Sequence, residues 1–424
     1  MTHSTTELAG QFLSVSDLYD GGLTDPFPLY AELREATPIA QGDILARYGA
    51  PQQADATQSG RPIVTVYRHA DVAEVLKNQV NWSSALLMDG LGSFLGDIML
   101  TGLGGDAHRK MRGLLQPWFS PSSLKKFNDS VIVPLVRDRF VAPLRAQGRM
   151  ELVGALALPY PIHVVYAMMG FPNDAAMIER FAGQALTILA SLTGDPEKLV
   201  QARADAFAAA QALYDDIKPI IAARRASGGE GDDLIAFLLH TQFEGLALDD
   251  HQIANVVRML LPAAAETTTR TLANLMVVLF DHPETLARVR EDRHLVPKAM
   301  NESMRYDPVA GYLARQATRD VTLSDVTIPA GTAASVSISS AHRDPRVFEN
   351  PETFDIDRQA KVNLGFGYGI HLCLGMPVAK LEIEAAVNAL LDLPNLRLDP
   401  AMPPPHIRGI TMRGPAAVHI AWDG

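Results

Sequence analysis

The chain contains a single cysteine, Cys373, in a ten-residue segment, 366–375, that also holds three glycines, two aromatic residues and a histidine. Glycines allow the backbone to pass close to one sulfur atom and to whatever that atom binds. The residues after Gly375 are apolar at helical spacing, with Pro377 suited to a first turn, so a helix should begin there with its amide end directed at the sulfur. Such a setting favours the thiolate, the form of cysteine that binds metals. We therefore expect Cys373 to be a metal ligand; a buried structural thiol is the alternative.

A second segment with chemical potential is 249–280, which begins with acidic residues and is then mostly apolar. Its length predicts a helix of about 45 Å that must cross the domain. In the middle, Pro262 removes a backbone hydrogen bond, and the alanines at 263–265 leave space beside the backbone. Glu266 and Thr267 follow, an acid and an alcohol that could hold and pass protons. Alternatively, Glu266 could pair with Arg270 four residues later, and the threonine could bond back to its own helix.

Two other groups of charged residues have helical spacing. His108 and Arg112 would share one face of a helix, and so would Glu302 and Arg305. Taken by themselves, both pairs are typical of a solvated surface, where an ion pair contributes little to stability.

Composition excludes several classes of protein. With 424 residues, of which 47% are hydrophobic, the chain can bury a large core. One cysteine excludes an intrachain disulfide, and no basic stretch followed by an apolar one opens the sequence, so we expect a cytoplasmic location. No apolar run reaches the roughly 18 residues of a membrane anchor. The net charge, 37 − 48 = −11, argues against a nucleic-acid partner.

The pattern of hydrophobic residues predicts mainly helix. Helical spacing dominates from about residue 71 to 226, whereas 62–67 and short runs within 321–338 have the β-branched alternation of strands. We expect a flexible N-terminal segment, 1–25, and a single domain, 26–424, with a helical lobe and a smaller β-containing lobe.

These motifs together point to a family. The pattern Phe-x-x-Gly-x-x-x-Cys-x-Gly, which Phe366, Gly369, Cys373 and Gly375 fill, closely resembles the haem-ligand loop of the cytochrome P-450 monooxygenases. The segment 263–268 resembles the family's distal oxygen-binding helix, although Ala264 stands in place of the usual glycine and Pro262 where a helix former is more common.

The other charged pairs fit the same family. His108 and Arg112 match its His-x-x-x-Arg motif, and Glu302 and Arg305 match its Glu-x-x-Arg motif. Four motifs thus occur in the family's order, and the resemblance runs from about residue 26 to the end of the sequence. Without an anchor, the chain resembles the soluble bacterial members.

The resemblance implies a fold and an activity. The fold would be mainly α with a minor β portion, of the triangular haem-thiolate type, with haem b (iron protoporphyrin IX) between the long distal helix and the cysteine loop. The enzyme would insert one atom of dioxygen into an apolar small organic substrate, by hydroxylation or epoxidation. Because Cys373 lies 51 residues from the end of the chain, we expect no fused reductase. A separate ferredoxin or flavodoxin with an NAD(P)H-dependent reductase would supply electrons to a monomer.

The resemblance also assigns roles to residues. Cys373 would be the axial ligand of the iron, Thr267 would hold dioxygen and its waters, and Glu266 would relay protons. Haem contacts would come from His108, Arg112, Arg315, His371, Phe366, Gly367, Gly375, Ala263 and Ala264, the first four of them binding the propionates. A structural triad would consist of Glu302, Arg305 and Arg358. Substrate contacts would come from Leu87, Met88, Val309, Leu313, Ile410 and Thr411. A basic patch for an acidic electron donor would comprise Arg109, Lys110, Lys125, Lys126 and Lys361.

Three other interpretations remain open at this stage. A peroxygenase of the same family would use peroxide directly, and a non-enzymatic sensor would bind haem and a gas without turnover. A structural protein with a buried cysteine would bind no haem at all.

Overall fold

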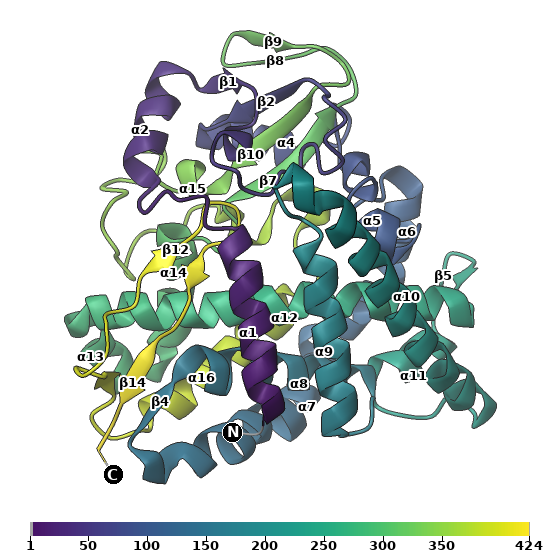
Figure 1. Cartoon of the computed structure of the whole chain (residues 1–424), viewed down its shortest axis with the longest axis vertical. Helices are drawn as coiled ribbons and strands as arrows, with labels where there is room; N and C mark the ends of the chain where they lie inside the picture. The colour runs from purple at the N-terminus through teal and green to yellow at the C-terminus, as the bar shows by residue number, and fades with distance from the viewer. Residues whose placement is uncertain (1–2, 424) are drawn as a thin grey trace.

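The computed structural model describes residues 3–423, apart from the side chains of residues 3–6 and 265 (Figure 1). Helices form most of it. The longer ones are α1 (His3–Leu18), α2 (Phe27–Ala36), α4 (His69–Lys77), α6 (Gly105–Leu115), α7 (Pro121–Phe127), α8 (Pro159–Met169), α9 (Ala175–Ala190), α10 (Pro196–Ala226), α11 (Leu234–His240), α12 (Asp250–Asp281), α13 (Pro283–Glu291), α14 (Val296–Tyr306) and α16 (Met376–Leu391). No helix of residues 3–423 is both long enough and apolar enough to cross a bilayer.

Helix α12 runs through the middle of the helical lobe, with α8, α9, α10, α14 and α16 packed around it (Figure 1). It begins with a capping box: the Asp249 side chain accepts from the Gln252 amide at 2.8 Å, and the Gln252 side chain accepts from the Asp249 amide at 3.1 Å. The last residue of α12 is Asp281. His282 caps the helix, and α13 begins at Pro283. The long helix expected over 249–280 is therefore present, and Pro262 does not end it.

The largest sheet has five strands in the order β1-β2-β10-β7-β3. These strands are β1 (Ile39–Gln41), β2 (Ile63–Val66), β10 (Ala333–Ser337), β7 (Tyr312–Ala317) and β3 (Trp82–Ser83). Strand β10 pairs in parallel with β2, Val336 lying opposite Val66, and antiparallel with β7. The sequence correctly placed strands at 62–67 and within 321–338, but only the tertiary structure joins them across more than 250 residues.

The remaining strands form small antiparallel units. A three-stranded sheet contains β11 (Arg397–Leu398), β14 (His419–Ala421) and β4 (Arg149–Glu151). Three hairpin-like pairs join β5 (Gln242–Phe243) to β6 (Leu246–Ala247), β8 (Val321–Leu323) to β9 (Val326–Ile328), and β12 (Ile407–Arg408) to β13 (Gly414–Pro415).

Most of the described part of the segment 1–25, which we expected to be flexible, is helix α1 (His3–Leu18). Helix α1 packs against α9, and Leu8, Phe12, Val15 and Tyr19 are buried in the helical core. Their spacing of three and four residues places them on one helix face. The polar residues between them concealed this pattern. The grouping of the rest of the chain, 26–424, into one domain of two lobes stays a prediction.

Candidate active site

The segment that leads to Cys373 contains two short helical turns, Leu364–Phe366 and Gly369–His371, and Cys373 itself lies between the second turn and the start of α16. The Cys373 amide donates to the carbonyl of Phe366 at 2.9 Å. Gly367 and Gly369 have φ angles of 75° and 74°, a conformation that favours glycine. At Gly369, a Cβ atom would also lie 2.9 Å from the carbonyl oxygen of Leu76. Glycine at this position is therefore required by the backbone, independently of any ligand.

The thiol of Cys373 lies at the beginning of α16, as the sequence predicted. Burial raises the pKa of this thiol, whereas hydrogen bonds from the amides of Gly375 and Met376, together with the charge of Arg112, lower it. Cys373 is nevertheless exposed, so open space adjoins it. The protein atoms that bury the thiol lie farther away, around this space. Amide donors and open space around one sulfur are what a metal-ligating thiolate requires.

Four cationic or imidazole side chains from three separate segments converge near this loop. The Arg112 Nη1 atom donates to the carbonyls of Ile370 at 3.0 Å and Leu372 at 2.7 Å. The rings of His108 and His371 lie 4.5 Å apart. Burial, and then the charges of Arg315, His108 and Arg112, lower the pKa of His371 to about 3.

This cluster has unsatisfied polar atoms. His108 Nε2 and His371 Nδ1 are buried and have no hydrogen-bond partner, while His371 Nε2 lies 3.0 Å from the hydroxyl of Ser84. Burial lowers the pKa of Arg315 to about 10, and its guanidinium donates to the carbonyl of Ala314 at 2.7 Å. Within residues 3–423, neither Arg112 nor Arg315 has a carboxylate within salt-bridge distance. Buried cations of this kind fit an anionic ligand, and the two propionates of haem b are of the right chemistry.

One face of α12 is open although the helix is buried on its other sides. Ala263 and Thr267 are exposed and Ala264 is half-buried. Thr267 lies three positions after Ala264 and four after Ala263, so its side chain shares a helix face with both. The Thr267 hydroxyl donates to the carbonyl of Ala263 at 3.1 Å. The small residues and the alcohol that the sequence singled out are therefore accessible from outside the helix.

Glu266 does not share this face. Its carboxylate accepts from Arg270 at 2.7 Å and 3.1 Å, and both side chains are almost completely buried. The hydroxyl of Tyr19, the residue after α1, donates to Glu266 at 3.4 Å. Of the two roles that the sequence left open for Glu266, the structure shows the ion pair with Arg270. A proton relay through Glu266 would require its carboxylate to separate from Arg270.

A second acid beside α12 was missed by sequence reasoning. Glu382, on α16, is buried and shares a hydrogen bond with the side chain of Thr268, and burial raises its pKa well above the usual carboxyl range. One of its oxygen atoms, Oε1, has no partner. The available signal was a single glutamate at a buried position of the apolar helix 376–391.

The predicted triad geometry is present on the side of α14. The guanidinium of Arg305 donates to the two carboxylate oxygens of Glu302 at 2.8 Å and 2.9 Å, and Arg358 donates to the same carboxylate at 3.1 Å. Arg305 also donates to the carbonyls of His342, Pro351 and Thr353, the last of which accepts from Arg358 as well.

The six residues expected to contact substrate have different environments. Leu87, Met88 and Leu313 are half-buried, and Val309 is buried. Ile410 is packed into an aromatic cluster that includes Tyr30, Tyr67 and Tyr312, and the buried hydroxyl of Thr411 donates to the carbonyl of Pro51 at 3.3 Å. The structure therefore gives Ile410 and Thr411 packing partners and does not support a direct contact with substrate, because neither side chain borders open space.

The expected basic patch is largely neutralised. Arg109 pairs with Asp106 and Glu244, and Lys110 also pairs with Asp106. Lys125 pairs with Asp129, and Lys126 pairs with Asp232. Of the five cations, Lys361 alone has no ion pair among the described residues.

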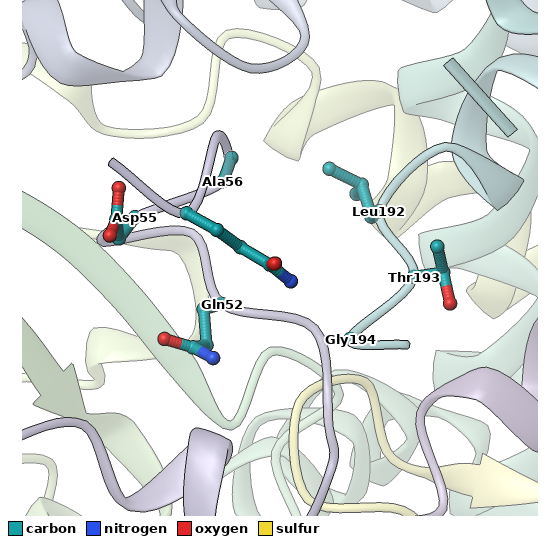
Figure 2. A pocket seen from close by; sticks show the side chains of 7 residues that line it. Gln52, Asp55, Ala56, Leu192, Thr193 and Gly194 are labelled. Atoms are coloured by element: carbon teal, nitrogen blue, oxygen red, sulfur yellow. The ribbon is translucent and has the colours of Figure 1, made fainter. Parts of the chain in front are cut away.

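Two pockets can be placed, and neither is lined by Cys373 or Thr267. The smaller, of about 10 Å³, lies where the loop containing Gln52, Asp55 and Ala56 meets the loop of Leu192, Thr193 and Gly194 (Figure 2). A volume of this size holds about one water molecule. The larger, of about 170 Å³, lies beside the triad and is lined in part by Glu302, Arg358 and Lys361.

Comparison with known proteins agrees with this geometry. Residues 173–415 match the family model described as "Cytochrome P450". The chain is 32% identical to cyclomarin C epoxidase CymV of Salinispora arenicola, over 77% of this chain and 82% of that protein. It is 28% identical to pulcherriminic acid synthase of Bacillus subtilis, over 96% and 98%.

Solved structures show the same architecture. CYP109E1 of Bacillus megaterium, in complex with testosterone, superposes with a TM-score of 0.79 at 26% identity, over 94% of this chain and 100% of that one. P450BioI, in complex with an acyl carrier protein carrying hexadec-9Z-enoic acid, gives a TM-score of 0.81 at 25% identity, over 94% and 99%.

Proposed function

Because this chain belongs to the cytochrome P450 family and is a haem-thiolate monooxygenase, we propose a specific division of roles among its residues. Haem b, with dioxygen as cosubstrate and electrons from a redox partner, supplies the chemistry that inserts one oxygen atom into a small organic substrate. The observation that carries the assignment is the thiol of Cys373, which receives amide hydrogen bonds and borders open space. We assign Cys373 as the residue whose thiolate would bind the haem iron.

His108, Arg112, Arg315 and His371 hold the propionates in this proposal. The unpartnered ring nitrogens of the two histidines support it, as does the lack of carboxylate partners for the two arginines within residues 3–423. Phe366, Gly367 and Gly375 would contact the haem from the cysteine loop, and the small side chains of Ala263 and Ala264 would leave room for it beside α12.

On the distal side, Thr267 is exposed beside the small residues Ala263 and Ala264. Its hydroxyl donates to the carbonyl of Ala263 in the structure, and in this proposal it turns away from that carbonyl to donate a hydrogen bond to the oxygen atoms of the cosubstrate. Glu266 is the proposed source of protons. In the structure it is held by Arg270 on another side of the helix, so it acts only after a rotation of its side chain. The Glu302, Arg305 and Arg358 triad is structural: it holds the segment that leads to the cysteine loop.

For the substrate, we propose an apolar molecule that contacts Leu87, Met88, Val309 and Leu313. The relatives support this class, since one of them is an epoxidase and one was solved with a steroid. For the partner, we propose a ferredoxin or flavodoxin with its NAD(P)H-dependent reductase, acting on a monomer. A cytoplasmic location also stays a prediction, consistent with a single cysteine.

The absorption spectrum of the purified protein, reduced under carbon monoxide, tests the central assignment. We expect a strongly red-shifted Soret band that disappears in Cys373→Ser. An unshifted carbonyl band, or no haem in a folded wild-type protein, would overturn the ligand assignment. Substrate candidates can then be screened by the spin-state shift that they cause.

A further inference from the structure

The N-terminal helix reaches the centre of the molecule. In Figure 1, α1 crosses α12 near its middle, and hydrogen bonds between the two helices show that they are in contact there. The Ser16 hydroxyl accepts from Arg270 at 2.9 Å, and the Tyr19 hydroxyl donates to Glu266 at 3.4 Å. Ser16, in α1, thus contacts Arg270, and Tyr19, just after the end of α1, contacts Glu266, the residue before Thr267.

The side chain of Arg270 is enclosed by α1 and a strand. Its guanidinium lies 4.9 Å from the ring centroid of Phe12 and 5.4 Å from that of Tyr19, both within the range of a cation–π contact. On another side it packs against Gly414, where a Cβ atom would lie 3.0 Å from its Cγ atom. Glu266 and Arg270 are both 2% exposed as residues, so the pair is sealed from solvent while α1 is in place.

The end of α1 is fixed by its own contacts. Arg408 pairs with Asp17 at 2.6 Å and with Asp20 at 3.4 Å. The Tyr19 carbonyl accepts from the Ile410 amide at 2.9 Å. Arg408 lies in β12, and Ile410 follows this strand. The end of α1 is therefore bound to the β12 segment on one side, while Ser16 and Tyr19 contact the Glu266–Arg270 pair on the other.

We propose that Ser16 and Tyr19 are positioning residues for proton delivery: α1 holds the Glu266–Arg270 pair away from Thr267 and so controls when Glu266 is released to carry a proton. This inference rests on the proposed role of Glu266. This role explains why Glu266, although it precedes Thr267, is paired with Arg270 in a site shielded from water. A buried charge is stable in such a site only with a partner. Loosening α1 lowers the cost of releasing Glu266.

The test uses two conservative variants, Ser16→Ala and Tyr19→Phe, each with a matched control. Ser14→Ala removes an exposed hydroxyl from the same helix, one that bonds only to the carbonyl of Gly10. Tyr166→Phe removes a buried tyrosine hydroxyl that has no partner. Each substitution is also made in a Glu266→Gln background, in which no carboxylate remains to be released.

Two measurements are made on haem-loaded protein. Hydrogen–deuterium exchange of residues 263–270, without turnover, reports whether α12 is held less firmly. NAD(P)H oxidation in H₂O and D₂O, with a plant-type ferredoxin and its reductase and no added substrate, reports the proton-dependent step. We expect faster exchange and a rate increase of about two- to fivefold in Ser16→Ala and Tyr19→Phe, with a smaller solvent isotope effect, since one hydrogen bond to a charged pair is lost. The controls and the Glu266→Gln series should show no such rate increase.

The outcomes separate this inference from the proposed function. If wild-type protein gives the red-shifted carbonyl band but Ser16→Ala and Tyr19→Phe match their controls, α1 only packs against the core and the inference is wrong. If their rates rise equally in the Glu266→Gln background, the effect does not pass through Glu266, and the inference is again wrong. If wild-type protein lacks the carbonyl band, the proposed function fails first, before any variant is compared.

Discussion

Two glutamate–arginine pairs lie on neighbouring helices, Glu266–Arg270 on α12 and Glu302–Arg305 on α14, and both are buried. They differ in what surrounds them. Glu302 accepts from a second arginine, Arg358, and from the Asp355 amide at 3.0 Å, and Arg305 donates to three backbone carbonyls. The supports of Glu266–Arg270 are side-chain hydroxyls of α1, one of them at 3.4 Å.

The difference indicates two uses of the same chemistry. A buried pair whose remaining hydrogen-bonding capacity is met by backbone atoms is fixed in one geometry. A buried pair supported by two hydroxyls can exchange partners at lower cost. We therefore assign the pair on α14 to holding the fold and the pair on α12 to controlled release.

The largest effect is expected from Glu302→Ala. The substitution leaves Arg305 and Arg358 without a carboxylate in a buried site, which should cost about 5 kcal/mol, near the upper end for breaking a buried pair. Urea unfolding of the purified protein measures this loss, and haem content should fall with it. Glu302→Asp, which keeps the charge, should lose less. If Glu302→Ala and wild type have the same free energy of unfolding, the triad does not stabilise the fold.

Arg270→Met should have a smaller effect, about 3 kcal/mol, because it leaves one buried charge, that of Glu266, without its partner rather than two. Adding Glu266→Gln removes the unpaired charge, so the double variant should recover much of the lost stability. The same unfolding measurement checks both. If the double variant is as unstable as the sum of the single ones, the two side chains do not interact energetically.

Acid should weaken the region of the triad through His342. Burial lowers the pKa of this histidine to about 3, and its Nε2 atom accepts from the Leu364 amide at 2.8 Å. A lowered pKa stabilises the folded state fully above about pH 6.5, and that stabilisation is lost as the pH falls toward 3. At pH 5 the loss should be about 2 kcal/mol relative to pH 7. His342→Gln, which keeps an acceptor but does not titrate, should flatten this dependence; an unchanged slope would exclude His342 as its source.

The smallest effect on stability is expected at the exposed pair Arg109–Glu244, with which the two buried pairs can be compared. Glu244→Gln removes one of the two carboxylates that pair with Arg109 on the surface and should leave the unfolding midpoint unchanged. Reduction by an acidic ferredoxin should become about twofold faster at low salt and match wild type at high salt. Asp138→Asn makes the same charge change beside Arg137 and is the control. A change in both variants, or in neither, would argue against Arg109 as part of the docking surface.

Local patterns were sufficient to predict several features. The glycines around Cys373 indicated a tight loop, and the capping and apolar residues of 249–280 indicated a long helix. The spacing of Glu302 and Arg305 indicated a pair on one helix face. Each of these depends on residues within a few positions of one another, so the sequence contains the information that determines it.

Tertiary contacts decided the features that the sequence left open or concealed. The Glu266–Arg270 pair is contacted by Ser16 of α1 and by Tyr19, which are about 250 residues away in the sequence. The burial of Ile410 and Thr411 depends on the aromatic cluster and on Pro51, and the pairing of Glu382 with Thr268 depends on how α16 packs against α12. The sequence by itself thus determined the reactive sulfur and the helices that present it, because those follow from local backbone geometry. The packing of distant segments decided which charged side chains are held and which are free, because the free energy of a buried charge depends on every group that surrounds it.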